Sequence, residues 1–214
     1  MNLPADISEP CMKPGERPRI GFIVGPTGSG KSALAINIAG RINAEIVNAD
    51  SRLFYRGLDI GAAKPTNEER RRVAHHLIDI RPPDEPIDAA GFSLLARAAI
   101  GDIRGRGKQA LVTGGSGLYL RALRHGIFTG PPAATGYRES LRAIALERGS
   151  ACLHDKLKEI DPVSAAKIGR NDLSRITRAL EVFQMTGIPI SHHHARHAFA
   201  DTPYDALTIA ISLE

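Results

Sequence analysis

The sequence has few cysteines and no long apolar run, and both absences narrow what the protein can be. Cys11 and Cys152 are the two cysteines among 214 residues, too few for a disulfide scaffold and in keeping with a reducing compartment. No apolar run approaches the roughly 20 residues that span a bilayer. Residues 1–19 also lack the apolar segment of a secretory signal. We therefore expect a cytoplasmic protein without a membrane anchor.

The excess of positive over negative charge is small as well. The sequence holds 28 lysines and arginines against 23 acidic residues, a formal net charge of +5 at pH 7. This mild excess permits a polyanionic partner such as nucleic acid without requiring one. Hydrophobic residues make up 43% of the chain, enough for a core, and the length predicts one domain or one domain with a modest addition.

Short apolar runs alternate with helical patterns along the first part of the chain. The alternation predicts a parallel sheet built from strand–helix–strand units. The predicted strands are residues 20–24, 44–48, 76–80 and 109–113, and the predicted helices include 33–42 and 92–103. Residues 207–211 have the pattern of one more buried strand, which would return to the sheet.

A glycine-rich loop between the first strand and the first helix carries the sharpest motif. It reads GPTGSGKS and matches the phosphate-binding pattern G-x-x-x-x-G-K-[ST]. Backbone N–H groups of such a loop and of the following helix surround phosphate oxygens, as in ATP-binding proteins. Lys31 adds a positive charge, and the Ser32 hydroxyl can ligate Mg²⁺. We predict a polyphosphate site made of Gly25, Pro26, Thr27, Gly28, Ser29, Gly30, Lys31 and Ser32.

The motif, the alternation of strands with helices and a change of composition after residue 128 together define the expected fold class and domains. We predict an α/β fold, a P-loop NTPase-like parallel sheet flanked by helices, with a small all-helical subdomain inserted. Prolines and glycines at 129–134 mark the entry to that insertion, and little strand signal follows up to residue 186. The predicted parts are a flexible tail at 1–18, the P-loop core at 19–128 plus 204–214, and the helical subdomain at 129–203.

The loop by itself does not specify a reaction. The strand at 109–113 ends without a carboxylate, which disfavours a motor or switch NTPase. Asp50 directly follows the second strand, and Ser116 follows the fourth. Because the carboxyl ends of parallel strands converge on the ligand crevice, Asp50 is a candidate base. Judged from the residues alone, Asp50 is equally a turn or cap residue and Ser116 a loop serine.

Five segments, in order, resemble the tRNA dimethylallyltransferase family, also called tRNA isopentenyl diphosphate transferases. They cover the chain from about residue 20 to its end and are more specific together than the loop alone. The segments are residues 25–32, 50–66 (DSRLFYRGLDIGAAKPT), 75–79 (HHLID), 114–120 (GGSGLYL) and 171–182, with Asn171, Asp172, Arg175 and the run RALEV.

The resemblance implies a prenyl transfer. Members of the family move the dimethylallyl group of dimethylallyl diphosphate onto N6 of adenine 37, next to the tRNA anticodon. The implied catalytic residues are Asp50 as the base, Ser116 as a hydroxyl near the diphosphate at a position usually threonine, and Lys31 with the loop on the leaving group. Mg²⁺ on Ser32 is the implied cofactor. The implied partners are the tRNA anticodon stem-loop and dimethylallyl diphosphate, and we expect a monomer.

The same resemblance implies contacts with tRNA in both parts of the chain. Arg175 and Arg178 are three residues apart, so they share a helix face that suits phosphate. From the residues alone, a solvated helix face is the alternative for these arginines. The implied tRNA-binding residues are Asp50, Ser51, Arg52, Leu53, Ser116, Arg138, Ser174, Arg175, Ile176, Thr177 and Arg178.

Some features depart from the family pattern. Ala62 stands where threonine is common, and Arg52 where a smaller or amide residue is common. The histidines at 192–194 and 197 lack a second ligand motif, so we expect a polar loop rather than a zinc site.

The largest departure is at the end of the chain, which stops soon after the last predicted strand. Family members continue with helices that include an arginine for the diphosphate. We expect a truncated chain that leaves apolar surface exposed. Loss of the C-terminal region would also be a reason for impaired transfer activity. The alternatives are a P-loop kinase of a small metabolite and an inactive remnant that binds diphosphate or RNA.

Overall fold

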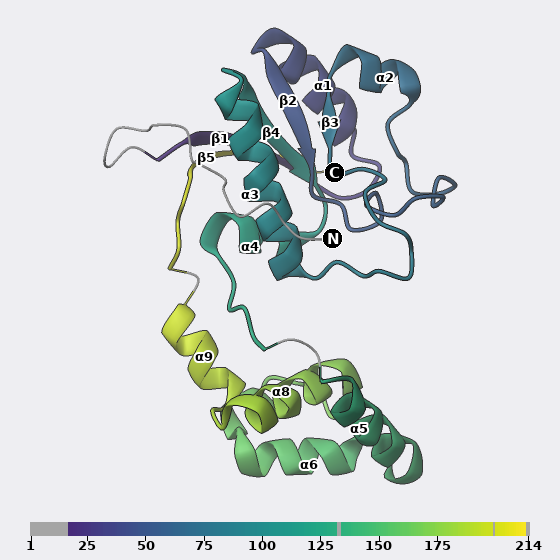
Figure 1. The fold of residues 1–214 in the computed structure, drawn as a ribbon, viewed down its shortest axis with the longest axis vertical. Coiled ribbons are helices and arrows are strands. Elements are labelled where there is room, and N and C mark those ends of the chain that lie inside the picture. The colour runs from purple at the N-terminus through teal and green to yellow at the C-terminus, as the bar shows by residue number, and fades with distance from the viewer. Residues whose placement is uncertain (1–16, 132–133, 199, 213–214) are drawn as a thin grey trace. The chain divides into compact units, whose positions relative to one another are not determined.

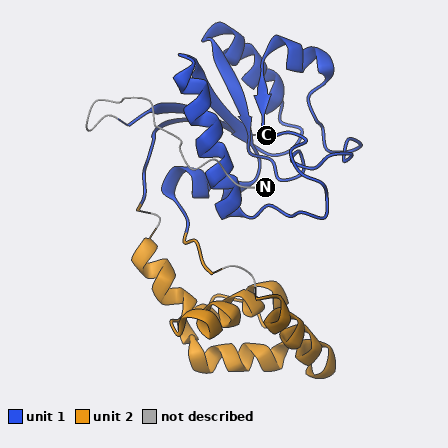
Figure 2. Ribbon diagram, in the orientation of Figure 1, with its two compact units in different colours: residues 1–127, 201–214 blue, residues 128–200 orange. Residues whose placement is uncertain are grey.

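The computed structural model describes residues 17–131, 134–198 and 200–212. The chain divides into two compact units, residues 1–127 with 201–214 and residues 128–200 (Figure 2). Each unit has its own hydrophobic core. Apart from residues 17 and 18, the predicted tail lies outside the described residues, as do residues 132 and 133 of the predicted linker. In the described ranges, no helix combines the length and the apolar character that crossing a membrane requires.

The first unit is built on a five-stranded parallel sheet with the strand order β3-β2-β4-β1-β5 (Figure 1). Its strands are β1 (Arg19–Val24), β2 (Ala44–Asn48), β3 (His75–His76), β4 (Gln109–Gly114) and β5 (Asp205–Ala210). The central strands carry apolar side chains on both faces, which requires helices on both sides. The predicted α/β fold, a P-loop-like parallel sheet flanked by helices, is confirmed.

Helices cover the two faces of this sheet with separate cores. On one face, α1 (Lys31–Arg41) packs Ala35 and Ile36 against Ile23 and Ile46. On the other face lie α3 (Ala89–Gly105) and α4 (Gly117–His125) (Figure 1). A short helix, α2 (Asn67–Arg72), begins with a capping box formed by Thr66 and Glu69.

An aromatic cluster anchors the loop that follows β2. Phe54 is completely buried and lies 5.9 Å, centroid to centroid, from both Phe92 of α3 and Tyr119 of α4. Phe92 and Tyr119 stack at 4.8 Å. Aromatic pairs at such distances stabilise the core beyond the area that they bury. The loop after β2 is therefore held against the α3–α4 face.

The strand predicted at 76–80 is wrong in length, because β3 ends at His76. Leu77 (φ +63°) and Asp79 (φ +57°) adopt left-handed backbone, which interrupts an extended strand. The backbone of this segment pairs with the loop after β2 instead: the N–H of Asp79 donates to the carbonyl of Leu53 at 3.0 Å, and that of Arg81 to Phe54 at 3.0 Å.

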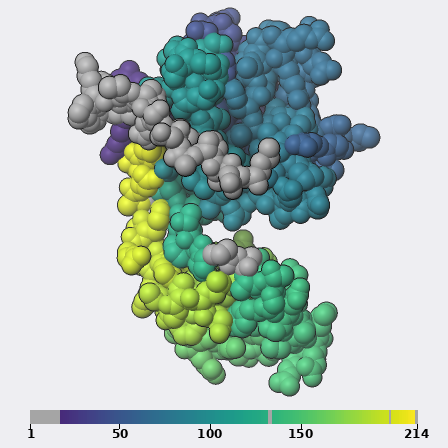
Figure 3. Space-filling model, viewed as in Figure 1, coloured from purple at the N-terminus to yellow at the C-terminus, as the bar shows by residue number. Residues whose placement is uncertain are grey.

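The last strand forms, but the prediction that it is buried is wrong. β5 pairs in register with β1 from Arg19 and Asp205 to Val24 and Ala210. Leu207 is nevertheless 71% exposed and Ile209 39%, because β5 is an edge strand that the described helices leave uncovered. The apolar surface expected here is present, and the residues near the C-terminal end, yellow in Figure 3, lie at the molecular surface.

The described part of the second unit is all-helical. Its helices are α5 (Thr135–Arg148), α6 (Ser150–Ile160), α7 (Pro162–Ala165), α8 (Leu173–Thr186) and α9 (Ile190–His197). Leu141, Leu157, Ile176 and Leu180 are central to its core. As the sequence predicts, Asp172 caps α8 by accepting from the Arg175 N–H, and Gly187 ends the helix in the left-handed region.

The polar loop predicted around the histidine cluster is wrong, since these residues form α9. Two side chains explain the helix: Ile190 is buried, and His193 stacks on Phe128 with ring centroids 4.3 Å apart. These contacts give α9 one buried face. Within the residues described, no group of three or more potential ligands is arranged to hold a metal ion.

Candidate active site

The glycine-rich loop joins β1 to α1 at the carboxyl end of the sheet. Gly28 (φ +83°) and Gly30 (φ +77°) both take left-handed backbone, which glycine adopts without a Cβ clash. Gly30 is also the N-cap of α1. The first N–H groups of α1 and the positive end of its dipole therefore lie at the loop, in the arrangement that binds phosphate groups.

Lys31 folds back over this loop. It is only 9% exposed, and its Nζ donates to the carbonyl of Pro26 at 3.0 Å. A bound anion would form a stronger, charge-assisted partner for the same ammonium group. Two more oxygens, Ser29 Oγ and Thr113 Oγ1, are buried and lack a hydrogen-bond partner among the residues described.

Close backbone packing brings the strand ends together. A Cβ added to Gly114 would lie 2.3 Å from the carbonyl carbon and oxygen of Ala49, and one on Gly25 would lie 2.9 Å from the carbonyl oxygen of Ile211. Gly115 approaches the Gly25 carbonyl at an ordinary van der Waals distance of 3.5 Å from the position of such a Cβ. The end of β4 can approach Ala49 because Gly114 carries no side chain, and the loop after β1 can approach Ile211 because Gly25 carries none.

Asp50 is partly buried and begins the turn after β2. Its Oδ1 accepts the N–H of Arg52 at 3.1 Å, and its carbonyl accepts the N–H of Leu53 at 3.2 Å. No residue that the structure describes donates to Oδ2. One carboxylate oxygen therefore closes the turn, while the other accepts from no described residue, so the turn interpretation and the prediction of a base are compatible.

Ser116 lies next to the Asp50 segment although it is far away in sequence. The N–H of Ser51 donates to Ser116 Oγ at 3.0 Å across 65 residues, and the N–H of Ser116 donates to the Ala49 carbonyl at 3.3 Å. The Ser116 hydroxyl does not cap α4. These bonds bring together the segments of the two predicted catalytic residues, whose catalytic role stays a prediction.

A buried lysine holds the rest of the loop. Lys64 donates to the Tyr55 carbonyl and to the carboxylates of Asp59 and Asp79, while Arg70 also pairs with Asp79. Burial opposes ionisation of Asp79, but Lys64 and Arg70 outweigh it and lower the pKa of that carboxyl. The sequence reasoning did not assign Lys64 or Asp79 a role; their place inside the resembling segments was the available signal.

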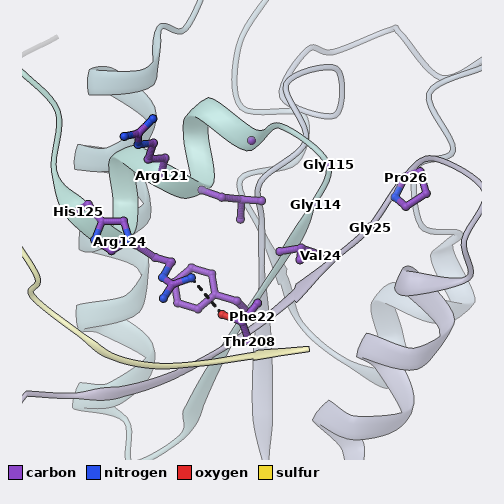
Figure 4. A pocket seen from close by; sticks show the side chains of 12 residues that line it. Phe22, Val24, Gly25, Pro26, Gly114, Gly115, Arg121, Arg124, His125 and Thr208 are labelled. Atoms are coloured by element: carbon purple, nitrogen blue, oxygen red, sulfur yellow. Dashed lines mark hydrogen bonds between the residues drawn. The ribbon is translucent and has the colours of Figure 1, made fainter. Parts of the chain in front are cut away.

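A cavity of about 530 Å³ lies beside the glycine-rich loop (Figure 4). Arg124 reaches across it, donating to Thr208 Oγ1 at 3.2 Å with its guanidinium 5.6 Å from the centroid of the Phe22 ring. Burial, then the charges of Arg124 and Arg121, lower the pKa of His125. The cavity thus has an apolar floor and a basic rim. Its lining comprises Phe22, Val24, Gly25, Pro26, Gly114, Gly115, Gly117, Leu120, Arg121, Arg124, His125 and Thr208.

The remaining predicted tRNA contacts lie in the helical unit, where the arginines have acidic partners. Arg138 binds the completely buried Glu181 with two N–H groups at 2.7 and 2.8 Å, and Arg178 binds it at 2.6 Å. Burial opposes ionisation of Glu181, but the two arginines outweigh it and lower its pKa to about 2. Arg175 pairs with Asp172. Of the other residues in the predicted segment, Ser174 is exposed, whereas Ile176 and Thr177 are buried.

Sequence comparisons place this arrangement among known proteins. Residues 53–214 match the family model described as IPP transferase. The tRNA dimethylallyltransferase 1 of Trichlorobacter lovleyi is 50% identical over 197 residues, which cover 92% of this chain and 65% of that relative. The tRNA dimethylallyltransferase of Geobacter metallireducens is 49% identical over 203 residues, covering 95% and 66%. The chain therefore spans just under two thirds of the length of these relatives.

Two solved structures are also similar to this chain. The full-length tRNA isopentenylpyrophosphate transferase of Bacillus halodurans is 40% identical with a TM-score of 0.56, covering 90% of this chain and 59% of that one. A eukaryotic dimethylallyltransferase acting on tRNA is 27% identical with a TM-score of 0.79, covering 92% and 49%.

Proposed function

The chain belongs to the IPP transferase family, and on this premise we propose that it transfers the dimethylallyl group of dimethylallyl diphosphate to N6 of adenine 37 in tRNA. The observation that carries the proposal is the hydrogen bond from the Ser51 N–H to Ser116 Oγ. It joins the segment of the candidate base to the strand end beside the phosphate loop. We therefore expect a diphosphate on that loop to be close to the Asp50 carboxylate, whose Oδ2 accepts from no residue that the structure describes.

In the proposed reaction, the bond between the allylic carbon and the diphosphate oxygen breaks as a bond from that carbon to N6 forms. Diphosphate leaves, and the N6 proton passes to the Asp50 carboxylate. The exocyclic amine of adenine is a poor nucleophile and a very weak acid, so the base helps mainly once the new bond is forming. Oδ2 is the oxygen for this role, because Oδ1 is engaged with the Arg52 N–H.

The phosphate loop would stabilise the leaving group. Negative charge grows on the diphosphate as the carbon–oxygen bond breaks, and fixed N–H groups with a nearby cation lower the energy of that charge. The loop amides, the N-terminus of α1 and Lys31 supply these groups.

The residues present also fit Mg²⁺, which prefers oxygen ligands. The exposed Ser32 hydroxyl would hold the ion, and Ser29 Oγ and Thr113 Oγ1, which lack a partner among the described residues, would be further oxygen donors. When bound, Mg²⁺ would neutralise charge on the diphosphate.

The cavity beside the loop suits the other part of this substrate. Val24 and Leu120, both partly exposed, offer apolar surface to the allylic tail, and the basic residues of α4 lie at its rim. For the acceptor, we propose that Asp50–Leu53 meet the target base and that Arg138, Arg175 and Arg178 contact tRNA phosphates. Loop RNA allows adenine to leave its stack at modest cost.

The test uses two labels. The protein is incubated with radiolabelled dimethylallyl diphosphate and unmodified tRNA, and separately with γ-labelled ATP and candidate small acceptors. We expect label in tRNA. Phosphoryl transfer to a metabolite would refute the proposal in favour of a kinase, and binding of diphosphate without turnover would indicate an inactive remnant. Asp50→Ala should abolish most of the transfer, whereas Asp84→Ala, an exposed carboxylate elsewhere in the same unit, should not.

A further inference from the structure

A buried polar side chain lies at the end of β2, beside the proposed base. Asn48 is only 2% exposed. A buried amide is costly unless its donors and acceptor are paired. Among the described residues, the partners of the Asn48 side chain are backbone groups: Nδ2 donates to the carbonyls of Asp50 and Leu77, each at 3.1 Å, and Oδ1 accepts the N–H of Asp50 at 2.9 Å.

One side chain thus binds both backbone groups of residue 50. With its N–H and its carbonyl held, residue 50 has little freedom to rotate about the backbone. The Asp50 carboxylate is restricted further, because its Oδ1 accepts the N–H of Arg52. The direction of the remaining oxygen, Oδ2, is therefore restricted jointly by the Asn48 bonds to the backbone and by the Arg52 bond to Oδ1.

The hydrogen bond from Asn48 to the Leu77 carbonyl connects the turn after β2 to the segment after β3. Leu77 has a φ of +63°, which is unusual for a bulky residue and turns its carbonyl toward Asn48. Backbone strain of this kind persists where surrounding contacts hold it and is concentrated at functional sites. Two residues later, Asp79 donates its N–H to Leu53. Asn48 therefore links the turn that carries Asp50 to the segment after β3, and the Asp79–Leu53 bond joins the same two segments.

We propose that Asn48 is a positioning residue that aims the Asp50 carboxylate at the acceptor amine without touching the substrate. This inference rests on the proposed function. The competing explanation is that Asn48 only pairs the backbone N–H and carbonyl groups at the end of β2 and so stabilises the fold. That explanation predicts a loss of stability with no selective effect on the chemical step.

The first test compares turnover with substrate binding. We expect Asn48→Ala to lower kcat by about 10- to 100-fold, since a small misplacement of a catalytic group is enough for such a loss. The KM for dimethylallyl diphosphate should stay within about twofold, because the described side-chain hydrogen bonds of Asn48 go to Asp50 and Leu77 and not to the phosphate loop. Asn48→Ser should recover part of kcat, as a hydroxyl can accept from the N–H of residue 50. The matched control is Asn37→Ala, an exposed asparagine on α1.

The second test is a double-mutant cycle with Asp50→Ala. If Asn48 acts through Asp50, adding Asn48→Ala should leave the residual rate of Asp50→Ala unchanged within about twofold. A full further loss would overturn the inference, as would a wild-type kcat in Asn48→Ala or a change confined to KM. Should Asn48→Ala not fold, a fall in kcat of Asn48→Ser at an unchanged melting temperature decides the question. A wild-type protein that puts no label into tRNA refutes the proposed function and this role together; normal transfer by Asn48→Ala refutes this role alone.

Discussion

Replacing Glu181 by glutamine should destabilise the helical unit selectively. The carboxylate is completely buried and accepts the N–H of Ala134 as well as three N–H groups from Arg138 and Arg178. Glutamine keeps the volume but removes the negative charge, so the two guanidinium groups lose the carboxylate that balances their charge. The change from an ordinary pKa of 4.5 to about 2 corresponds to about 3 kcal/mol of stabilisation.

The usual cost of breaking a buried ion pair leads to a similar loss of unfolding free energy. Removing one partner of a buried ion pair typically costs about 3–5 kcal/mol. The arginine side chains are 35% and 34% exposed, so water screens part of the loss and favours the lower end, about 3 kcal/mol. The assay is urea unfolding followed by circular dichroism, with Glu159→Gln, an exposed glutamate of α6, as the control. A cost below about 1 kcal/mol would refute the reasoning.

The pH dependence provides an independent check. Folding lowers the pKa of Glu181, so the folded state binds this proton less tightly than the unfolded chain. The stabilisation is complete above pH 4.5 and is lost as the pH falls toward about 2. The difference in unfolding free energy between wild type and Glu181→Gln should therefore shrink over that window. A difference that stays constant down to the acid end would show that the carboxylate charge is not its source.

Three further outcomes are expected. Gly114→Ala should cost about 1–3 kcal/mol and abolish transfer to tRNA, because the new Cβ would overlap the Ala49 backbone; normal activity would contradict the close approach. Lys64→Met should raise the pKa of Asp79, measurable by carboxyl NMR, and lower the free energy of urea unfolding by about 2 kcal/mol, the usual loss for a hydrogen bond to a charged group that water partly screens; an unchanged urea midpoint would refute the role of this ion-pair cluster. Leu207→Ser should change stability by no more than about 0.5 kcal/mol, since the side chain is 71% exposed, and a larger loss in thermal unfolding would mean that β5 is covered in solution.

Local patterns were sufficient for the parts of the fold that are made locally. The loop from Gly25 to Ser32 was predictable because a strand, a glycine pattern and a helix follow each other directly along the chain. Asp172 and Gly187 marked the two ends of α8 for the same reason, since caps act within one turn of the helix. The segments that resemble the family were also contiguous stretches.

Periodicity was a poor guide wherever distant contacts decide the outcome. The run at 76–80 is apolar enough for a strand, yet hydrogen bonds to Leu53 and Phe54 turn it away from the sheet. The apolar pattern of β5 suggested burial, but burial depends on which helices cover the edge of the sheet. Neither property is encoded in spacing along one segment.

The sequence by itself determined the phosphate-binding loop, the α/β class and the order of the family segments. Only the tertiary structure brought Ser51 and Ser116 into hydrogen-bond contact across 65 residues and enclosed Asn48 beside Asp50. The physical reason is that local conformation follows from neighbouring residues, whereas a site depends on which strand ends lie side by side. In this protein the strand order β3-β2-β4-β1-β5, which differs from the sequence order, makes that choice.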